Sequence, residues 1–117
     1  MKTNKHYIIN NFINYIANIR RYSKHTIRSY QYDLNNYYDY SISKSSDLDF
    51  LLLDQNTIKS YLHYLSKRKL SSKTIARKLA SIKSLYNYMY RNNIIDVNYA
   101  KFIKTPKIDK NYLIIFL

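Results

Sequence analysis

Residues Leu70–Arg91 read LSSKTIARKLASIKSLYNYMYR and predict one long amphipathic helix. Ser71 or Ser72 can cap its first backbone N–H groups. Apolar residues then recur at steps of four, three, four and three, which places them on one stripe of a helix. The members of this stripe are Ile75, Leu79, Ile82, Tyr86 and Met89.

The opposite face of this predicted helix is polar and basic. It carries Lys73, Arg77, Ser84, Asn87 and Arg91, with Lys83 on its flank. From residue 55 to residue 95 the chain has nine lysines or arginines and no acid. A helix with an apolar back and an unneutralised basic front is suited to nucleic acid. A solvated surface helix in a basic protein is the alternative interpretation.

The composition favours an all-α fold. The chain has 117 residues, which is one domain or a piece of a larger protein, and 46% of them are hydrophobic. It contains no glycine and one proline. Helices need neither residue, whereas sheets with tight hairpins usually do. The absence of glycine also excludes the glycine-rich loops that hold phosphate in nucleotide-binding proteins.

The charge indicates a polyanionic partner. The formal net charge is +13, and all seven acids are aspartates. DNA, RNA and an anionic membrane surface would each fit. The membrane is the weakest of these, since no apolar run approaches the roughly 20 residues of a spanning helix. There is no secretory leader and no cysteine, so we expect a cytoplasmic protein.

Residues 6–21 predict the first helix, which has more apolar surface than one core contact needs. Its stripe and the residues that widen it are Ile8, Phe12, Tyr15 and Ile19, with Ile9, Ile13 and Ile16. Either several helices surround this surface, or part of it docks on another chain or domain.

Residues 22–40 predict the second helix, with Ser23 as its N-cap. Its inward face comprises Ile27, Tyr30, Leu34, Tyr37 and Tyr38. Its first turn is basic and hydroxyl-rich, with Lys24, His25, Thr26 and Arg28. A free helix N-terminus with such side chains can anchor a phosphate. Ser23 and Thr26 can cap the helix at the same time.

Residues 54–68 predict the third helix, with Asp54 as N-cap and the stripe Ile58, Tyr61, Leu62 and Leu65. Residues 67–69 form a basic corner, placed where cations suit a helix C-terminus. The chain enters the next helix at once, so these two helices should pack together. The polar, serine-rich residues 41–53 are expected to be a linker, and residues 98–104 a short helical turn.

No standard catalytic or metal-binding arrangement is visible. The three histidines, His6, His25 and His63, have no ligand partner at helical spacing. There is no glutamate, and no serine can lie in a nucleophile elbow, which needs glycines. We therefore expect no metal, no cofactor and no small-molecule substrate. DNA binding by basic residues with interleaved tyrosines remains.

A series of individually weak motifs nevertheless occurs in a specific order. The chain has S-K-x-T-x-x-x-Y-x-x-D-L, then Y-L-x-x-L, then L-S-x-x-T-I-x-R-K-L-x-x-I-K-x-L-Y-x-Y, then N-x-A and a PK pair. These motifs comprise Ser23, Lys24, Thr26, Tyr30, Asp33 and Leu34; Tyr61, Leu62 and Leu65; Leu70, Ser71, Thr74, Ile75, Arg77, Lys78, Leu79, Ile82, Lys83, Leu85, Tyr86 and Tyr88; and Asn98, Ala100, Pro106 and Lys107. The chain resembles the N-terminal, SAM-like core-binding domain of the tyrosine recombinases, of the Xer and phage-integrase type.

The resemblance implies a bundle of four to five helices that clamps one side of a double-stranded DNA, while a separate catalytic domain clamps the other. It implies that the second and fourth helices approach the major groove. The DNA-contacting residues would be Lys24, His25, Thr26, Arg28, Ser72, Lys73, Thr74, Arg77 and Lys83. The first helix would contact a neighbouring recombinase protomer through Ile9, Ile13 and Ile16.

The resemblance also implies that this chain is not an enzyme by itself. The nucleophilic tyrosine and the activating Arg, Lys and His residues of the family belong to the catalytic domain, so none of the 15 tyrosines is expected to be a nucleophile. Residues 1–107 would be the core-binding domain and residues 108–117 the start of the linker. In the linker Ile114 stands where the family commonly has a proline.

Two other interpretations stay open. The chain could be a stand-alone DNA-binding regulator, dimeric through its first helix, or a helical protein-interaction module that is basic only through its composition. Each makes a different prediction about the basic face, because only a DNA-binding protein depends on those charges.

Overall fold

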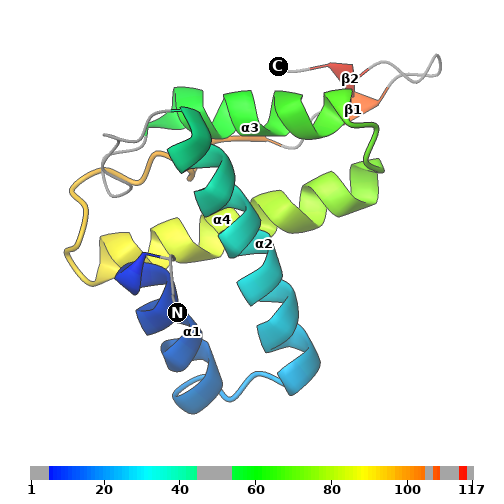
Figure 1. Ribbon diagram of the computed structural model, residues 1–117. Helices are drawn as coiled ribbons and strands as arrows, with labels where there is room; N and C mark the ends of the chain where they lie inside the picture. Colours follow the sequence, from blue (N-terminus) through cyan, green and yellow to red (C-terminus); the bar gives the residue numbers. More distant parts are fainter. Residues whose placement is uncertain (1–5, 45–53, 105–106, 109–113, 116–117) are drawn as a thin grey trace. The chain divides into compact units, whose positions relative to one another are not determined.

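The computed structural model describes residues 6–44, 54–104, 107–108 and 114–115. In chain order the elements are α1 (Tyr7–Asn18), α2 (Lys24–Lys44), α3 (Gln55–Lys67), α4 (Ser72–Arg91), β1 (Lys107–Ile108) and β2 (Ile114–Ile115), as Figure 1 shows. The predicted all-α class is confirmed, with helices at the four predicted places. The chain forms two compact units, residues 1–50 and residues 51–117.

The first unit is built on the contact between α1 and α2. His6 caps α1, since its Nδ1 accepts a hydrogen bond from the N–H of Ile8 at 3.1 Å. Aromatic rings then join the helices: Phe12 of α1 meets Tyr30 of α2 edge-on, with ring centroids 5.7 Å apart. Tyr22, in the turn before α2, stacks on the same Tyr30 ring at 6.0 Å.

The large apolar surface predicted for α1 is mostly covered within the chain, which is the first of its two predicted alternatives. Ile9 and Ile16 are 1% and 2% exposed, so the chain itself already covers them. Ile13 is half-buried. The expectation that these three isoleucines face another protomer is therefore wrong for Ile9 and Ile16. The helix ends at Asn18, and Ile19 beyond it is 69% exposed.

The second helix is longer than predicted, because Ser41 to Lys44 continue α2 instead of beginning the linker. Ser41 is buried, and its hydroxyl donates to the carbonyl of Tyr37 at 2.9 Å. Ser43 donates in the same way to Tyr40 at 2.7 Å. These bonds satisfy each hydroxyl inside the helix, so polar residues extend it. The rest of the predicted linker, residues 45–53, lies outside the described residues.

The second unit contains the helical hairpin α3–α4, and the predicted packing of these helices is confirmed. Asp54 caps α3 by accepting from the N–H groups of Asn56 and Thr57, at 3.0 and 3.2 Å. Every residue of both predicted stripes is buried: Ile58, Tyr61, Leu62 and Leu65 of α3, and Ile75, Leu79, Ile82, Tyr86 and Met89 of α4.

Both helices of this hairpin end in the same backbone motif without glycine. After α3, the N–H of Lys69 donates to the carbonyl of Ser66 and the N–H of Leu70 to that of Leu65. Asn93 and Ile94 repeat the pattern after α4. These are Schellman ends, which favour glycine because one residue takes a positive φ. Here the positive φ falls on Lys69 (63°) and Asn93 (60°), and after α1 on Arg21 (55°).

Beyond α4 the expected short helical turn appears at residues 99–102. The Asn98 side chain accepts from the N–H of Ala100 at 3.1 Å, and Ala100 and Ile103 are buried. Two residues of β1 then pair antiparallel with β2, Lys107 opposite Ile115 and Ile108 opposite Ile114. No pattern of residues predicts this strand pairing. No helix within the described ranges is long and apolar enough to cross a membrane.

Candidate nucleic-acid interface

The helices α2 and α4 begin in the same way. Each starts from a serine N-cap followed by Thr-Ile, in Ser23-Lys24-His25-Thr26-Ile27 and Ser71-Ser72-Lys73-Thr74-Ile75. In both, the serine Oγ accepts from the threonine N–H at 3.1 Å and donates to the threonine Oγ1 at 2.9 Å. The predicted caps at Ser23 and at Ser71 are thus confirmed.

This cap leaves the two helix starts suited to an anion. The first backbone N–H groups of a helix have no acceptor inside the helix. The serine side chain accepts only from the backbone N–H of the threonine. The N–H groups of the two residues in between therefore point out of the helix end, where the positive end of the helix dipole lies. Each threonine hydroxyl accepts from the serine and keeps its own proton for donation.

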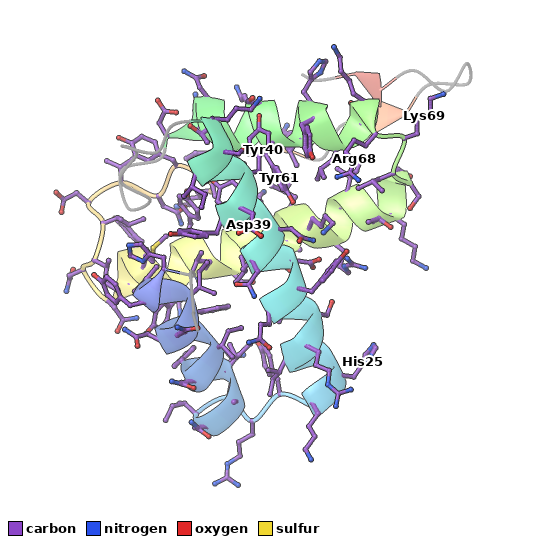
Figure 2. All side chains as sticks on the ribbon, viewed as in Figure 1. His25, Asp39, Tyr40, Tyr61, Arg68 and Lys69 are labelled. Carbon is purple, nitrogen blue, oxygen red and sulfur yellow. The ribbon has the colours of Figure 1, made fainter. Side chains whose placement is uncertain are left out.

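At the start of α2, the structure exposes the cations that the sequence nominated. Lys24, His25 and Arg28 are exposed, and Thr26 is half-buried. Figure 2 shows the His25 side chain projecting outward from the first turn of α2. The charged groups here are thus open to a ligand, while the threonine is held in place by the cap.

At the start of α4, Ser72, Lys73 and Arg77 are exposed. Thr74 and Lys83 are half-buried. Lys73 and Arg77 lie four residues apart, so their side chains occupy neighbouring positions on one helix face. An exposed lysine and arginine beside a helix N-terminus form a local concentration of positive charge.

One cation of α4 does not belong to this face. Lys78 is only 4% exposed, although it lies next to Arg77. Its position, three residues after Ile75, falls on the buried stripe. The aliphatic stem of lysine can be buried among apolar side chains. The basic front of α4 is therefore narrower than a count of its lysines and arginines indicates.

The described residues show no site for metal chemistry. Within residues 6–44, 54–104, 107–108 and 114–115, no three His, Asp or Glu side chains lie close enough together to hold an ion. The two helix starts, with their cations and hydroxyls, are instead equipped for polyanion binding.

Comparison with known proteins assigns the family. Residues 9–93 match the family model for the phage integrase N-terminal SAM-like domain. The chain belongs to this family. The matched residues of the integrase SAM-like domain include α2, α3, α4 and most of α1. Both helix starts and all nine nominated residues therefore lie inside the match.

Curated relatives of this integrase SAM-like domain are tyrosine recombinases. The chain is 35% identical over 106 residues to tyrosine recombinase XerC of Pelotomaculum thermopropionicum. This alignment covers 87% of the chain and 35% of the relative. A tyrosine recombinase of Pseudothermotoga lettingae is 34% identical over 103 residues, covering 86% and 35%. XerC of Leptospira interrogans is 30% identical over 100 residues, covering 85% and 32%.

The chain thus spans about a third of the length of the curated relatives it matches. The family model describes the N-terminal domain of integrases. No solved structure matches the chain significantly.

Proposed function

We propose that this integrase SAM-like domain is the DNA-binding module of a site-specific tyrosine recombinase, and that it clamps duplex DNA at a recombination site. The observation that carries the proposal is the repeated helix start, in which a serine–threonine cap stands among exposed cations in both α2 and α4. The net charge of +13 supports the same partner. Strand transfer would need a catalytic domain, and the module alone would not perform it.

Most residues of the two helix starts would position the duplex through its phosphates, and one residue would recognise a base. Lys24 and Lys73 would contact phosphates, together with the outward N–H groups and the hydroxyls of Thr26 and Thr74. His25, Arg28, Ser72 and Lys83 would extend these contacts. Arg77 would reach a base edge, because a guanidinium can pair with both acceptors of guanine in the major groove.

The salt dependence of DNA binding tests the proposal. We expect this chain to bind a labelled duplex of about 30 base pairs, measured by fluorescence anisotropy. If about five phosphates are neutralised, log K should fall against log salt with a slope near −4.5. Absence of binding even at low salt would overturn the proposal and favour the protein-interaction module.

A separate prediction concerns Arg77. We expect Arg77→Ala to weaken binding to a cognate site by about 1–3 kcal/mol and to relax the base preference at one position. Comparing the variant on cognate and unrelated duplexes measures both effects. Equal affinities of wild type and variant on the cognate site would exclude Arg77 as a base contact.

The proposal includes the wider setting of the module. Neighbouring protomers would meet α1 through exposed residues such as Tyr7, at 59%, and Ile19 beyond its end, rather than through Ile9 and Ile16. Residues 1–107 would form the binding domain and residues 108–117 the start of the linker. A DNA-binding role would place the protein in the cytoplasm of a bacterial cell. A stand-alone DNA-binding regulator would share these properties but would have no catalytic segment in its coding sequence.

A further inference from the structure

The turn between α3 and α4 carries three consecutive cations that the proposed interface does not use. Lys67 is the last residue of α3, Arg68 is its C-cap, and Lys69 follows. All three are exposed. Figure 2 shows Arg68 and Lys69 at this turn, directly before the start of α4. We call these three residues the basic turn.

The arginine of the basic turn is held in position by a tyrosine. The Arg68 Nη1 donates to the Tyr64 hydroxyl at 3.1 Å, and its guanidinium carbon lies 5.6 Å from the centre of the Tyr64 ring. The Tyr64 ring in turn stacks on Tyr61 with centroids 6.2 Å apart. A guanidinium has five N–H donors, so this single bond leaves most of them for a ligand. Because the side chain is already ordered, less entropy is lost when it binds.

Lys69 is exposed, so burial in the core does not explain a lysine there. Its φ of 63° is the conformation that favours glycine or asparagine, and Asn93 occupies the equivalent position after α4. A lysine at this position adds a charge without improving the backbone fit.

Charge within the second unit is sharply separated along the hairpin. In residues 54–104 the acids are Asp54 and Asp96, at the start of α3 and beyond the end of α4. Since α3 has 13 residues, it is about 20 Å long, and this length separates Asp54 at its start from the turn at its end. Asp96 lies beyond the end of α4, which has 20 residues, so it is farther from the turn than Asp54 is. Both distances exceed the Debye length of about 8 Å at physiological salt. The basic turn is thus unneutralised by the described acids of its own unit.

A similar arrangement occurs in the turn before α2. Arg20 lies 5.4 Å from the centre of the Tyr22 ring, and Arg21 takes the positive φ. The pKa of Arg20 is raised above its ordinary value, first because the Tyr15 side chain hydrogen-bonds to it and then through electrostatic interaction with Tyr22. Each helix start with a serine–threonine cap is therefore preceded by a cation that contacts a tyrosine.

We propose that the basic turn, Lys67–Lys69, contacts backbone phosphates of the duplex beside the start of α4. This inference rests on the proposed DNA-binding function and adds contacts to it. The competing role is purely structural, because cations near the C-terminus of α3 interact favourably with its dipole. That role would change the stability of the helix and leave DNA binding unaffected.

The test compares two double variants in the salt titration. Lys67→Gln with Lys69→Gln removes two charges from the basic turn. Lys59→Gln with Lys101→Gln removes two exposed charges from the same unit, one in α3 and one beyond the end of α4. Both have the same net charge, and circular dichroism verifies that both fold. We expect the slope of log K against log salt to become less steep by about 1.8 for the first variant only, with roughly 60-fold weaker binding at 0.1 M salt.

The outcomes separate the two proposals. An unchanged slope in the turn variant, or an equal change in both variants, would overturn the role of the basic turn while the DNA-binding function stands. Failure of the wild-type chain to bind the duplex would overturn both. Arg68→Lys gives a further check, since it keeps the positive charge but loses the planar guanidinium group and its several N–H donors. We expect it to keep the slope and to bind severalfold more weakly.

Discussion

Charge reversal at Lys73 and Arg77 is expected to reduce DNA affinity by roughly 100-fold at 0.1 M salt, because the proposed phosphate contact and the proposed base contact both become anions that the duplex repels. Both residues are exposed at the start of α4, so the double variant Lys73→Glu with Arg77→Glu should fold as the wild type does. Fluorescence anisotropy with the same duplex measures the loss. The slope against salt should become less steep by about 1 to 2.

The matched control is Lys59→Glu with Lys101→Glu, which changes the net charge equally. Both residues are exposed, one on α3 and the other beyond the end of α4. We expect a small effect in the control, since the attraction between distant charges is screened. Similar losses in both variants would mean that affinity follows total charge, and the start of α4 would then have no special role.

Truncation of Leu62 should give the largest loss of stability. Its side chain is 0% exposed in α3, on the stripe that packs in the α3–α4 unit. Leu62→Ala removes this packing and leaves a cavity, which should lower the free energy of unfolding by about 3 kcal/mol. For a domain of this size the midpoint of thermal unfolding should fall by roughly 10–15 °C.

Thermal unfolding followed by circular dichroism at 222 nm measures this effect. Lys59→Ala, one turn earlier on the exposed face of α3, is the control and should change stability by less than about 0.5 kcal/mol. A comparable loss in both variants would contradict the assignment of the core. Below its unfolding temperature Leu62→Ala should still bind DNA, because the surface cations are unchanged.

The helices could be predicted because caps and periodicity agree. Asp54, Ser23 and Ser71 each cap the helix they were expected to cap. Every apolar residue of the predicted stripes of α3 and α4 is buried. The end of α2 was missed because serine is neutral in propensity, and only the bonds of Ser41 and Ser43 to preceding carbonyls reveal that the helix continues.

The exposure of a candidate-site residue was predictable where its side chain projects from a regular helix. It was less predictable where burial depends on packing by neighbouring elements. The exposure of Lys24, Lys73 and Arg77 follows from helical periodicity alone. The burial of Ile9 does not, because it depends on which surfaces cover this residue. Residues 67–69 were recognised as basic, but the contact that orders Arg68 requires the position of the Tyr64 ring.

Because the chain has no glycine, glycine substitutions at its helix ends could still increase its stability. Arg21, Lys69 and Asn93 hold a positive φ at the cost of backbone strain that glycine would not have. Replacement of Arg21 or Asn93 by glycine would add stability without touching the core or the proposed phosphate contact of Lys69. Changes of function commonly cost stability, so such a replacement could offset the cost of new cations on the proposed DNA-binding surface. These helix ends would therefore let the domain change its proposed DNA-binding surface and remain folded.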